Sequence, residues 1–341
     1  MPGPTLKLIG RRLLEAVPAL IGIVVVTFLL TRALPGDPAV LFAGPTADEK
    51  TIAEVRQALG FDKPLVTQFG IYLKMLATGD LGQSISTGQS VAKELLYRLP
   101  ASMELTFAAL ILAIVVALPM GIYAATRPNS LYDHACRLVT TAGVSMPPFF
   151  TGLLLVYIFY AQLGWAPSPM GRLSILHSAP PAVTGFYTID ALLAGEPSIA
   201  AAALAQLVLP AATLALFTLA PIARMARASM LQVLSSDFIR TARAAGLTRR
   251  QVLWTYAFRN AVLPVITTIG MLLSFMLGAN VLVEKVFSWP GIGSFALDAL
   301  VASDYAAVQG FVLTMAVLFV LLNLLIDIIY MMVEPRVRVD G

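Results

Sequence analysis

Six stretches of apolar, almost uncharged residues constrain this chain more than any other feature of its sequence. About 20 helical residues cross the hydrocarbon core of a bilayer, so an apolar run of about 18 or more predicts a membrane span. Only 12% of the 341 residues are charged, against about 25% in a soluble domain. We therefore predict an all-α integral membrane protein with six transmembrane helices. Their approximate ranges are 13–30, 105–125, 138–163, 200–222, 261–283 and 306–329.

The basic residues favour one orientation of these spans. The segments placed inside hold fourteen Lys and Arg residues, whereas the two short outer loops hold only Arg172 and Lys285. Such an excess is typical of the cytoplasmic face, so both termini are predicted to be cytoplasmic. Lys7, Arg11 and Arg12 would also suit a signal peptide, but the apolar run is long and TRALPGD offers no small-x-small cleavage site. An uncleaved first span is therefore favoured.

The long connection between the first two spans is predicted to be folded and helical. Thr46 followed by Glu49 fits a capping box that opens a helix, and Gly60 is suited to close it. Two further short helices are expected before the second span. They cover 64–76 and 90–99, and the second of them ends at Pro100.

These features divide the chain into three parts. We find no tandem repeat, low-complexity tract or second soluble domain in the sequence. The parts are an N-terminal tail with the first span (1–34), an outer helical segment (35–100) and a core with spans two to six (101–341), which contains an arginine-rich connection at 223–260.

That connection includes the stretch SSDFIRTARAAGLTRRQVLW, residues 235–254, in which four arginines accompany a single acid. Ser236 or Asp237 can cap a helix, and Gly246 supplies the conformation that ends one. The helix between them is predicted to present a narrow face of small apolar groups. That face consists of Phe238, Ala242 and Ala245.

A second helix is predicted directly after this hinge, because Thr248 and Gln251 match a capping box. One interpretation is an amphipathic element lying on anionic lipid, where each basic residue contributes on the order of 1 kcal/mol. Two features favour docking to a protein instead. First, helices that anchor in lipid use Trp, Phe and Leu, and small residues are poor anchors. Second, an elbow with two capped helices has more structure than lipid binding requires.

The sequence FIRTARAAGL…RNAVLPV around the hinge resembles the cytoplasmic coupling motif of binding-protein-dependent ABC importers, in the form used by dipeptide, oligopeptide and nickel permeases. The motif of the broad family begins Glu-Ala-Ala, followed by three residues and a glycine. This chain has Arg240, Thr241 and Ala242 there, before Gly246. Arg259 stands where many such permeases have a proline. Both departures resemble the peptide-importer branch of the family.

Other stretches resemble the same branch, in the same order and spacing, across nearly the whole chain. They are PGDPAVLFAG (35–44), LGFDKPL (59–65), GDLGQS (79–84), VSMPPFF (144–150), VEKVFSWPGIG (283–293), DYAAVQG (304–310) and NLLIDIIY (323–330). The extended outer loop containing TGFYTIDALLAGE (184–196) is most similar to the dipeptide type.

This resemblance implies a permease subunit with the type I ABC importer permease architecture, which moves di- or oligopeptides inward across the inner membrane by alternating access. Its partners would be a homologous second permease, two cytoplasmic ATPase subunits, an extracytoplasmic substrate-binding protein and membrane lipid, with no nucleic acid. The chain has no G-x-x-x-x-G-K-[ST] phosphate loop, so the ATPase subunits would bind ATP and Mg, and this chain would hold no cofactor and catalyse nothing. The residues implied to dock on the ATPase are Asp237, Phe238, Arg240, Thr241, Ala242, Ala245, Gly246 and Leu247.

Other substrates and one other class of transporter stay open. Nickel chelates, glutathione-like molecules and sugars pass through relatives of this design. An ion-coupled secondary carrier usually has internal repeats and charges near the midplane, and spans two to five contain no such charge. No nucleophile and base are placed for catalysis, and His134 and His177 lack the neighbours of a metal site.

Three further features have two interpretations each. The turn SWPGIG is either a gate or binding-protein contact, through Trp289, Pro290 and Gly291, or an ordinary turn with its tryptophan in the aromatic belt. Asp327, with Asn323 on the same face of the last span, is a functional or a structural group, and pairing with Arg336 favours the structural role. Glu104, at the outer mouth of the second span, lies near the transport path or in solvent.

Overall fold

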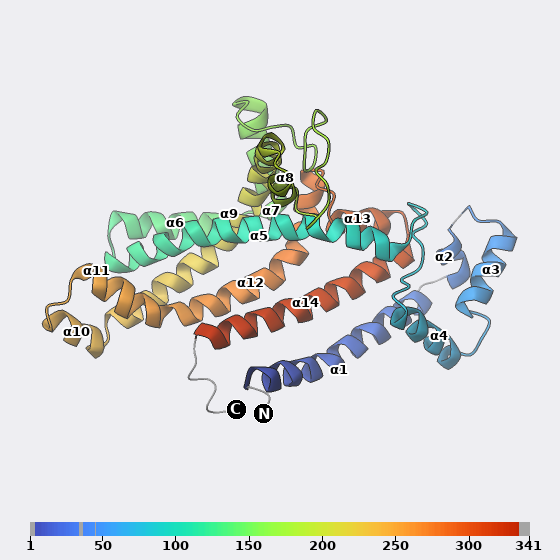
Figure 1. The fold of residues 1–341 in the computed structure, drawn as a ribbon, viewed down its shortest axis with the longest axis horizontal. Helices are drawn as coiled ribbons and strands as arrows, with labels where there is room; N and C mark the ends of the chain where they lie inside the picture. The colour runs from blue at the N-terminus through green and yellow to red at the C-terminus, as the bar shows by residue number, and fades with distance from the viewer. Residues whose placement is uncertain (1–3, 34–36, 45, 334–341) are drawn as a thin grey trace. The chain divides into compact units, whose positions relative to one another are not determined.

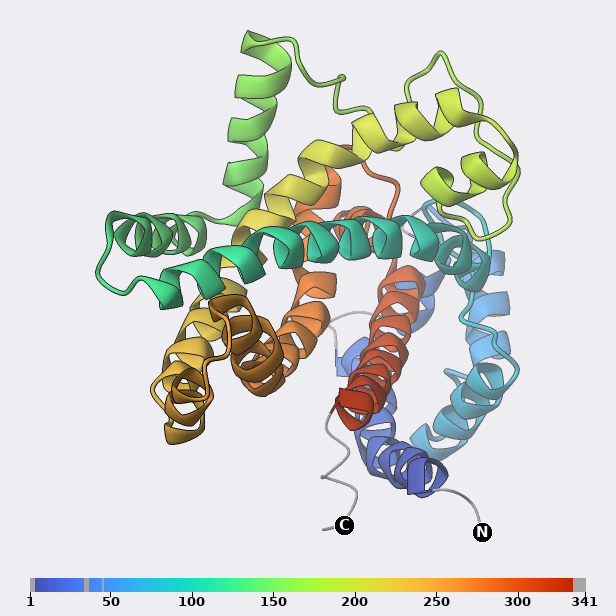
Figure 2. The same cartoon turned by 60° about the vertical axis from the view of Figure 1, so that its left-hand side comes forward.

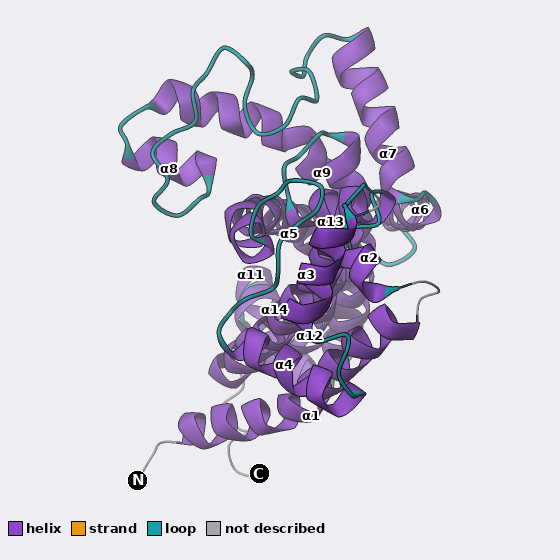
Figure 3. Cartoon of the chain, turned by 90° about the vertical axis from the view of Figure 1, so that its right-hand side faces the viewer, coloured by secondary structure: helices purple, strands orange, loops and turns teal. Residues whose placement is uncertain are grey.

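The computed structural model describes residues 4–33, 37–44 and 46–333, and its regular elements there are helices (Figures 1 and 3). Within those ranges no β-strand forms apart from an isolated bridge between Gln83 and Ser90. The prediction of an all-α membrane protein is confirmed. Five helices are long and apolar enough to cross a membrane, and a bent pair adds a sixth crossing if it acts as one span. The five are α1 (Pro4–Ala33), α5 (Val91–Thr126), α9 (Pro197–Leu234), α12 (Arg259–Val286, with the turns before it) and α14 (Tyr305–Val333).

The bent pair occupies the third predicted span. α6 (Leu131–Ser145) meets α7 (Pro148–Leu155), which the π-helical turn η1 (Val156–Gln162) continues, at an angle of 105° (Figure 2). Met146 at the break has an extended backbone, because a residue that precedes a proline is pushed out of the α region. Two successive prolines follow it and remove two backbone donors. The apolar stretch 138–163 therefore forms two helices and not one.

The larger of two compact units comprises residues 103–289 and the end of the chain from Leu322. α9 is its central helix and contacts α6, α7, α12 and the short helix α8 (Tyr187–Leu193). Small residues let α5 and α9 approach closely. A Cβ on Gly121 of α5 would lie 2.5 Å from the carbonyl oxygen of Ala223 on α9, so only glycine fits there. The same contact is lined by further small residues, namely Ala113, Ala117, Ala215 and Ala226.

The smaller unit comprises the chain up to Ser102 and residues 290–321, and it includes α2 (Pro38–Ala43), α3 (Glu49–Leu59), α4 (Leu65–Ala77) and α13 (Ile292–Val301). Thr27 of α1 joins three helices of this unit. Its hydroxyl bonds the Tyr72 hydroxyl of α4 at 3.1 Å, and its carbonyl accepts from Nε2 of Gln309 in α14 at 2.8 Å. Just before α14, the buried carboxylate of Asp304 accepts from the Ser84 hydroxyl at 2.6 Å. The outer segment is thereby fastened to two membrane spans.

The outer helices are present as predicted, but two of their ends differ. α3 ends at Gly60, whose φ is +66°, as expected. Its N-cap is Asp48, whose carboxylate accepts the Thr51 N–H at 2.9 Å, and not Thr46. The prediction of a helix ending at Pro100 is wrong, because α5 continues through it. Proline is more frequent in spanning helices than in soluble ones, because neighbouring helices and side chains can satisfy the carbonyl that it leaves without a donor.

Candidate functional site

The candidate site is the elbow, residues 236–251, which consists of α10 (Asp237–Ala244), a turn at Gly246 and α11 (Arg249–Gln251). Figure 1 shows α10 and α11 folded back beside each other near the end of α5. Gly246 has a left-handed backbone with φ +77°, and its N–H donates to the Arg243 carbonyl at 3.1 Å. A Cβ there would meet nothing within 4 Å, so glycine is needed for its conformation and not for space. The predicted hinge conformation is confirmed.

The second cap of the elbow also forms as predicted. The Thr248 hydroxyl accepts the N–H of Gln251 at 3.3 Å, and the side-chain oxygen of Gln251 accepts the N–H of Thr248 at 3.0 Å. From this capping box the helix runs through the π-helical turn η2 (Val252–Phe258) into α12. The first cap differs from the expectation. Ser236 precedes α10, but its hydroxyl donates to the Val233 carbonyl at 2.6 Å and does not cap the helix.

One face of α10 is buried and the opposite face is exposed. Ile239 is fully buried and Ala242 is 7% exposed, and both belong to a cluster with Ile122 of α5 and Met230 of α9. Phe238 is 45% exposed. The predicted face of Phe238, Ala242 and Ala245 is therefore not exposed as a whole, because Ala242 lies three residues after Ile239 and is buried with it on the inner face. Of the predicted docking residues, Leu247 is half-buried and the exposed ones are Asp237, Phe238, Arg240, Thr241, Ala245 and Gly246.

A hollow of about 560 Å³ lies beside the elbow, where no local pattern predicts one. The ends of α5 and α9 and the start of the helix after the hinge form its walls. Arg243 and Arg249 are part of its lining, so two of the four arginines of the stretch gather around one concave surface. The remaining lining residues are Ala125, Thr126, Pro128, Leu231, Leu234, Ser235, Leu247, Val252 and Leu253.

A buried ion-pair cluster joins α6 to α9. The carboxylate of Asp133 accepts two bonds from Arg227, at 2.5 Å from Nε and 2.8 Å from Nη2. Nη2 of Arg137 donates to the same carboxylate at 2.9 Å, and the Asn129 N–H donates at 3.0 Å. Asp133 has no exposed surface, and a buried charge is stable only when it is paired and hydrogen-bonded in this way. The i,i+4 spacing of Asp133 and Arg137 was a visible signal, but Arg227 is 94 residues away along the chain.

A second buried carboxylate, Glu104, fastens the extended outer loop to α5. One of its oxygens accepts from Arg172 at 2.6 Å, and the other accepts the N–H and the hydroxyl of Thr188 at 2.9 and 2.7 Å. The Arg172 guanidinium carbon lies 3.5 Å from the centre of the Tyr187 ring, an arrangement that favours a cation–π contact. The interpretation of Glu104 as a solvated residue is therefore wrong.

Asp190 in α8 closes the same loop on itself. Its carboxylate accepts the Thr184 hydroxyl at 2.7 Å and the N–H groups of Thr184, Gly185 and Val183 at 2.8, 2.9 and 3.2 Å. Burial acts to raise the pKa of this carboxyl, but the four hydrogen bonds stabilise the ionised form and outweigh it. The pKa of Asp190 therefore lies below its ordinary value.

The turn SWPGIG does not expose its aromatic residue. Trp289 is 1% exposed, and its backbone N–H donates to the Glu284 carbonyl at 2.7 Å. A tryptophan of the aromatic belt would face lipid headgroups, so that interpretation is wrong. Gly291 is buried as well, and Pro290 is the exposed residue of the three. A gating or contact role for this turn stays a prediction.

Two other expectations concern single polar residues. Asp327 lies within α14, and its predicted partner Arg336 lies outside the described residues. Neither His134 nor His177 belongs to a group of three His, Cys, Asp or Glu side chains that could hold a metal ion, among the residues that the structure describes.

Comparison with known proteins gives nearly full-length matches. Residues 117–339 match the family described as the binding-protein-dependent transport system inner membrane component, and residues 5–106 match the N-terminal region of the corresponding membrane component. The chain is 42% identical over 320 residues to the probable D,D-dipeptide transport system permease protein DdpB of Escherichia coli K12, covering 94% of each protein.

Two further relatives come from other bacteria. The chain is 42% identical over 334 residues to the di/tripeptide transport system permease protein DppB of Pseudomonas aeruginosa, covering 98% of this chain and 99% of the relative. It is 39% identical over 330 residues to the dipeptide transport system permease protein DppB of Alkalihalophilus pseudofirmus, covering 96% and 98%. Since both the family match and the relatives extend over most of the sequence, the chain belongs to the family of binding-protein-dependent transport system inner membrane components.

Proposed function

We propose that this chain is the permease subunit of an ATP-driven importer that moves peptides of the di- or oligopeptide class inward across the cytoplasmic membrane. The relatives named for dipeptide and di/tripeptide transport support the substrate class, because they are at least 39% identical over nearly the full length. The observation that carries the proposal is the elbow. It combines an exposed outer face on α10 with a buried inner face, and it leads into a span without a break in the helix.

The proposed orientation places both termini and the elbow in the cytoplasm, as the excess of Lys and Arg around these segments favours. The exposed face of α10 would then dock on one of two ATPase subunits, which bind ATP and Mg. A homologous second permease would complete the pathway, and an extracytoplasmic binding protein would deliver the peptide. Arg240 and Arg243 on the elbow would face acidic groups of the ATPase.

The geometry supports a specific route for coupling. Movement of α10 would press on α5 and α9 through Ile239 and Ala242, which are buried against both helices. It would also reach α12 directly, through the capping box at Thr248 and the helix that follows. Reversing a 1:99 equilibrium between inward-facing and outward-facing states takes about 5.5 kcal/mol of differential binding. A packed element transmits such a bias, whereas a mobile tail does not.

The experiment that tests the proposal is uptake by the reconstituted complex. Proteoliposomes would contain this chain, its partner permease and the ATPases, with ATP inside and the binding protein outside. We expect accumulation of a labelled dipeptide that requires both ATP and the binding protein. Uptake driven by a proton gradient without any ATPase would contradict the proposal and identify an ion-coupled carrier. ATP-dependent uptake of a nickel chelate, a glutathione-like molecule or a sugar, but of no peptide, would contradict the substrate class alone.

A further inference from the structure

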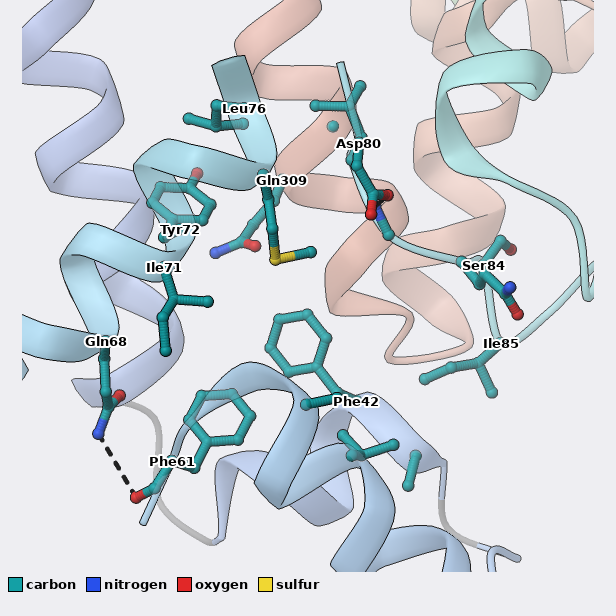
Figure 4. Close-up of a pocket in the computed structure, with 18 of the residues that line it drawn as sticks. Phe42, Phe61, Gln68, Ile71, Tyr72, Leu76, Asp80, Ser84, Ile85 and Gln309 are labelled. Atoms are coloured by element: carbon teal, nitrogen blue, oxygen red, sulfur yellow. Dashed lines mark hydrogen bonds between the residues drawn. The ribbon is translucent and has the colours of Figure 1, made fainter. Parts of the chain in front are cut away.

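The smaller unit contains a hollow of about 450 Å³, here called the outer hollow (Figure 4). Its walls are α2, α3, α4, the turn at residues 80–88 and the first turns of α14. Figure 4 shows Phe42, Phe61, Ile71 and Ile85 converging on it from different elements. Val55 of α3, Met75 of α4 and Leu313 of α14 also line it, so apolar side chains dominate the helical walls. The turn at 80–88 adds the polar side chains of Asp80, Gln83 and Ser84.

Three polar side chains of the helical walls are engaged with the protein itself. Nε2 of Gln68 donates to the Lys63 carbonyl at 2.9 Å, and the Tyr72 hydroxyl bonds the Thr27 hydroxyl at 3.1 Å. Nε2 of Gln309 donates to the Thr27 carbonyl at 2.8 Å. A peptide or an ion lodged among the helical walls, away from the turn at 80–88, would have to give up its hydration for few new hydrogen bonds. The chemistry of the walls therefore favours an apolar ligand.

The outer hollow lies at the boundary of the membrane-spanning helices. Gln309 and Leu313 are part of the candidate span of α14, and Thr27, which bonds two of the wall residues, is near the end of the candidate span of α1. The hollow is therefore bordered by spanning helices on one side and by outer helices on the other.

α4 adds a second, independent sign of contact with lipid. One face of α4 lines the hollow with residues that include Ile71, Tyr72 and Met75. Its other face is exposed and mostly apolar, with Val66 at 85% and Leu65 at 58% exposure, and its last turn carries Lys74. An uncovered, mostly apolar helix face with a basic residue near its end is typical of a helix in the interfacial region of a bilayer. Because one face of α4 is uncovered, this helix fits the interfacial region of the bilayer, and the hollow behind it opens beside lipid.

From these observations we propose that the outer hollow holds an acyl chain of a membrane lipid. Such a chain needs no hydrogen bonds and is stabilised by transfer of each methylene to an apolar wall. The volume is several times that of the apolar cavity of about 150 Å³ that accommodates benzene. The acyl chain would fill the space between α3, α4 and α14, and it would anchor the outer segment to the bilayer.

Photocrosslinking tests the proposal directly. The full chain, with the subunits that purify with it, would be placed in nanodiscs of phosphatidylethanolamine and phosphatidylglycerol with a trace of phospholipid carrying a diazirine near the end of one acyl chain. After irradiation and proteolysis, mass spectrometry is expected to find lipid adducts on Phe42, Phe61 and Met75. Val55→Trp fills the hollow and should lower these adducts about tenfold, equivalent to about 1.4 kcal/mol of affinity. Val66→Trp, on the exposed face of α4, should leave them unchanged.

Three results would overturn the proposal. One is lipid adducts confined to the outer surfaces of the spans, with none on the residues of the hollow. Another is equal labelling of Val55→Trp and Val66→Trp. The third is crosslinking of p-benzoylphenylalanine at position 61 to a partner protein instead of lipid, which would identify a protein segment as the occupant. If Val55→Trp does not fold, Ala58→Phe fills the same hollow from the neighbouring turn of α3 and provides the same comparison.

Discussion

Two buried carboxylates of the larger unit, Asp133 and Glu104, are each paired with an arginine but join different kinds of structure. Asp133 joins helix to helix, because Arg227 on α9 and Arg137 on α6 both bond to it. Glu104 joins a helix to a loop, through Arg172 and Thr188. In the proposed coupling, α6 and α9 move together, and the ion pair between these two helices preserves their packing. Glu104 instead holds a long loop against α5. Several hydrogen bonds from the backbone and side chains of that loop to the carboxylate keep it there.

The largest effect is expected from Asp133→Ala, which leaves Arg227 and Arg137 without their common acceptor. Removing one partner of a buried ion pair typically costs about 3–5 kcal/mol. We expect a markedly lower unfolding temperature of the purified protein and loss of the contact between α6 and α9. Arg137→Ala is the matched control, since its half-exposed side chain should contribute far less. Equal unfolding temperatures for wild type and Asp133→Ala would show that the cluster does not stabilise the helix pair.

A smaller effect is expected from Glu104→Gln, which keeps the shape and one acceptor oxygen but removes the charge. Leaving the charged Arg172 imperfectly paired should cost about 2–3 kcal/mol, because bonds to charged groups are worth more than neutral ones. The change should appear as faster cleavage of the loop at residues 173–186 by an added protease, with uptake and unfolding less affected than in Asp133→Ala. Protection of the loop equal to that of the wild type would contradict the proposed role of Glu104.

The smallest effect is expected on lowering the pH. It concerns the loop that Asp190 closes and not the pair of helices α6 and α9. The pKa of Asp190 is lower in the folded protein than in the unfolded chain, so its stabilisation is complete well above the unfolded value of about 3.9 and is lost as the pH falls through the folded pKa. We expect cleavage of the loop by pepsin to increase below about pH 4. Asp190→Asn should remove much of this dependence on pH. A loop equally protected at all acidic pH values would contradict the role of Asp190.

Much of this architecture is readable from the sequence, because apolar length and cap chemistry are local signals. The six apolar stretches, the left-handed hinge at Gly246 and the capping box at Thr248 depend on residues within a few positions of each other. The bend after Met146 is also encoded locally, in a proline pair, although the apolar pattern alone predicts one span over 138–163.

The features that the sequence pattern does not predict depend on residues far apart in the chain. Arg227 reaches Asp133 across 94 residues, and Glu104 reaches Thr188 across 84. The inward orientation of Ala242 depends on how α10 lies against α5 and α9, which periodicity within eight residues does not determine. The outer hollow likewise forms between elements from both ends of the sequence. Non-local pairing, and not local propensity, accounts for each of these differences.

The central claim is that the exposed face of the elbow couples an ATPase to transport, and substitution of Phe238 tests it most directly. Phe238→Asp places a charge on the exposed face of α10 without touching the buried cluster. The matched control is Tyr97→Asp, which changes a 73% exposed aromatic residue in the smaller unit. Both variants would be assembled with the partner subunits and assayed in the same proteoliposomes for bound ATPase and for ATP-driven peptide uptake. We predict that Phe238→Asp lowers both about tenfold or more, a loss of at least about 1.4 kcal/mol of docking free energy, while Tyr97→Asp retains them. Undiminished uptake and ATPase binding by Phe238→Asp, at normal expression, would contradict the claim.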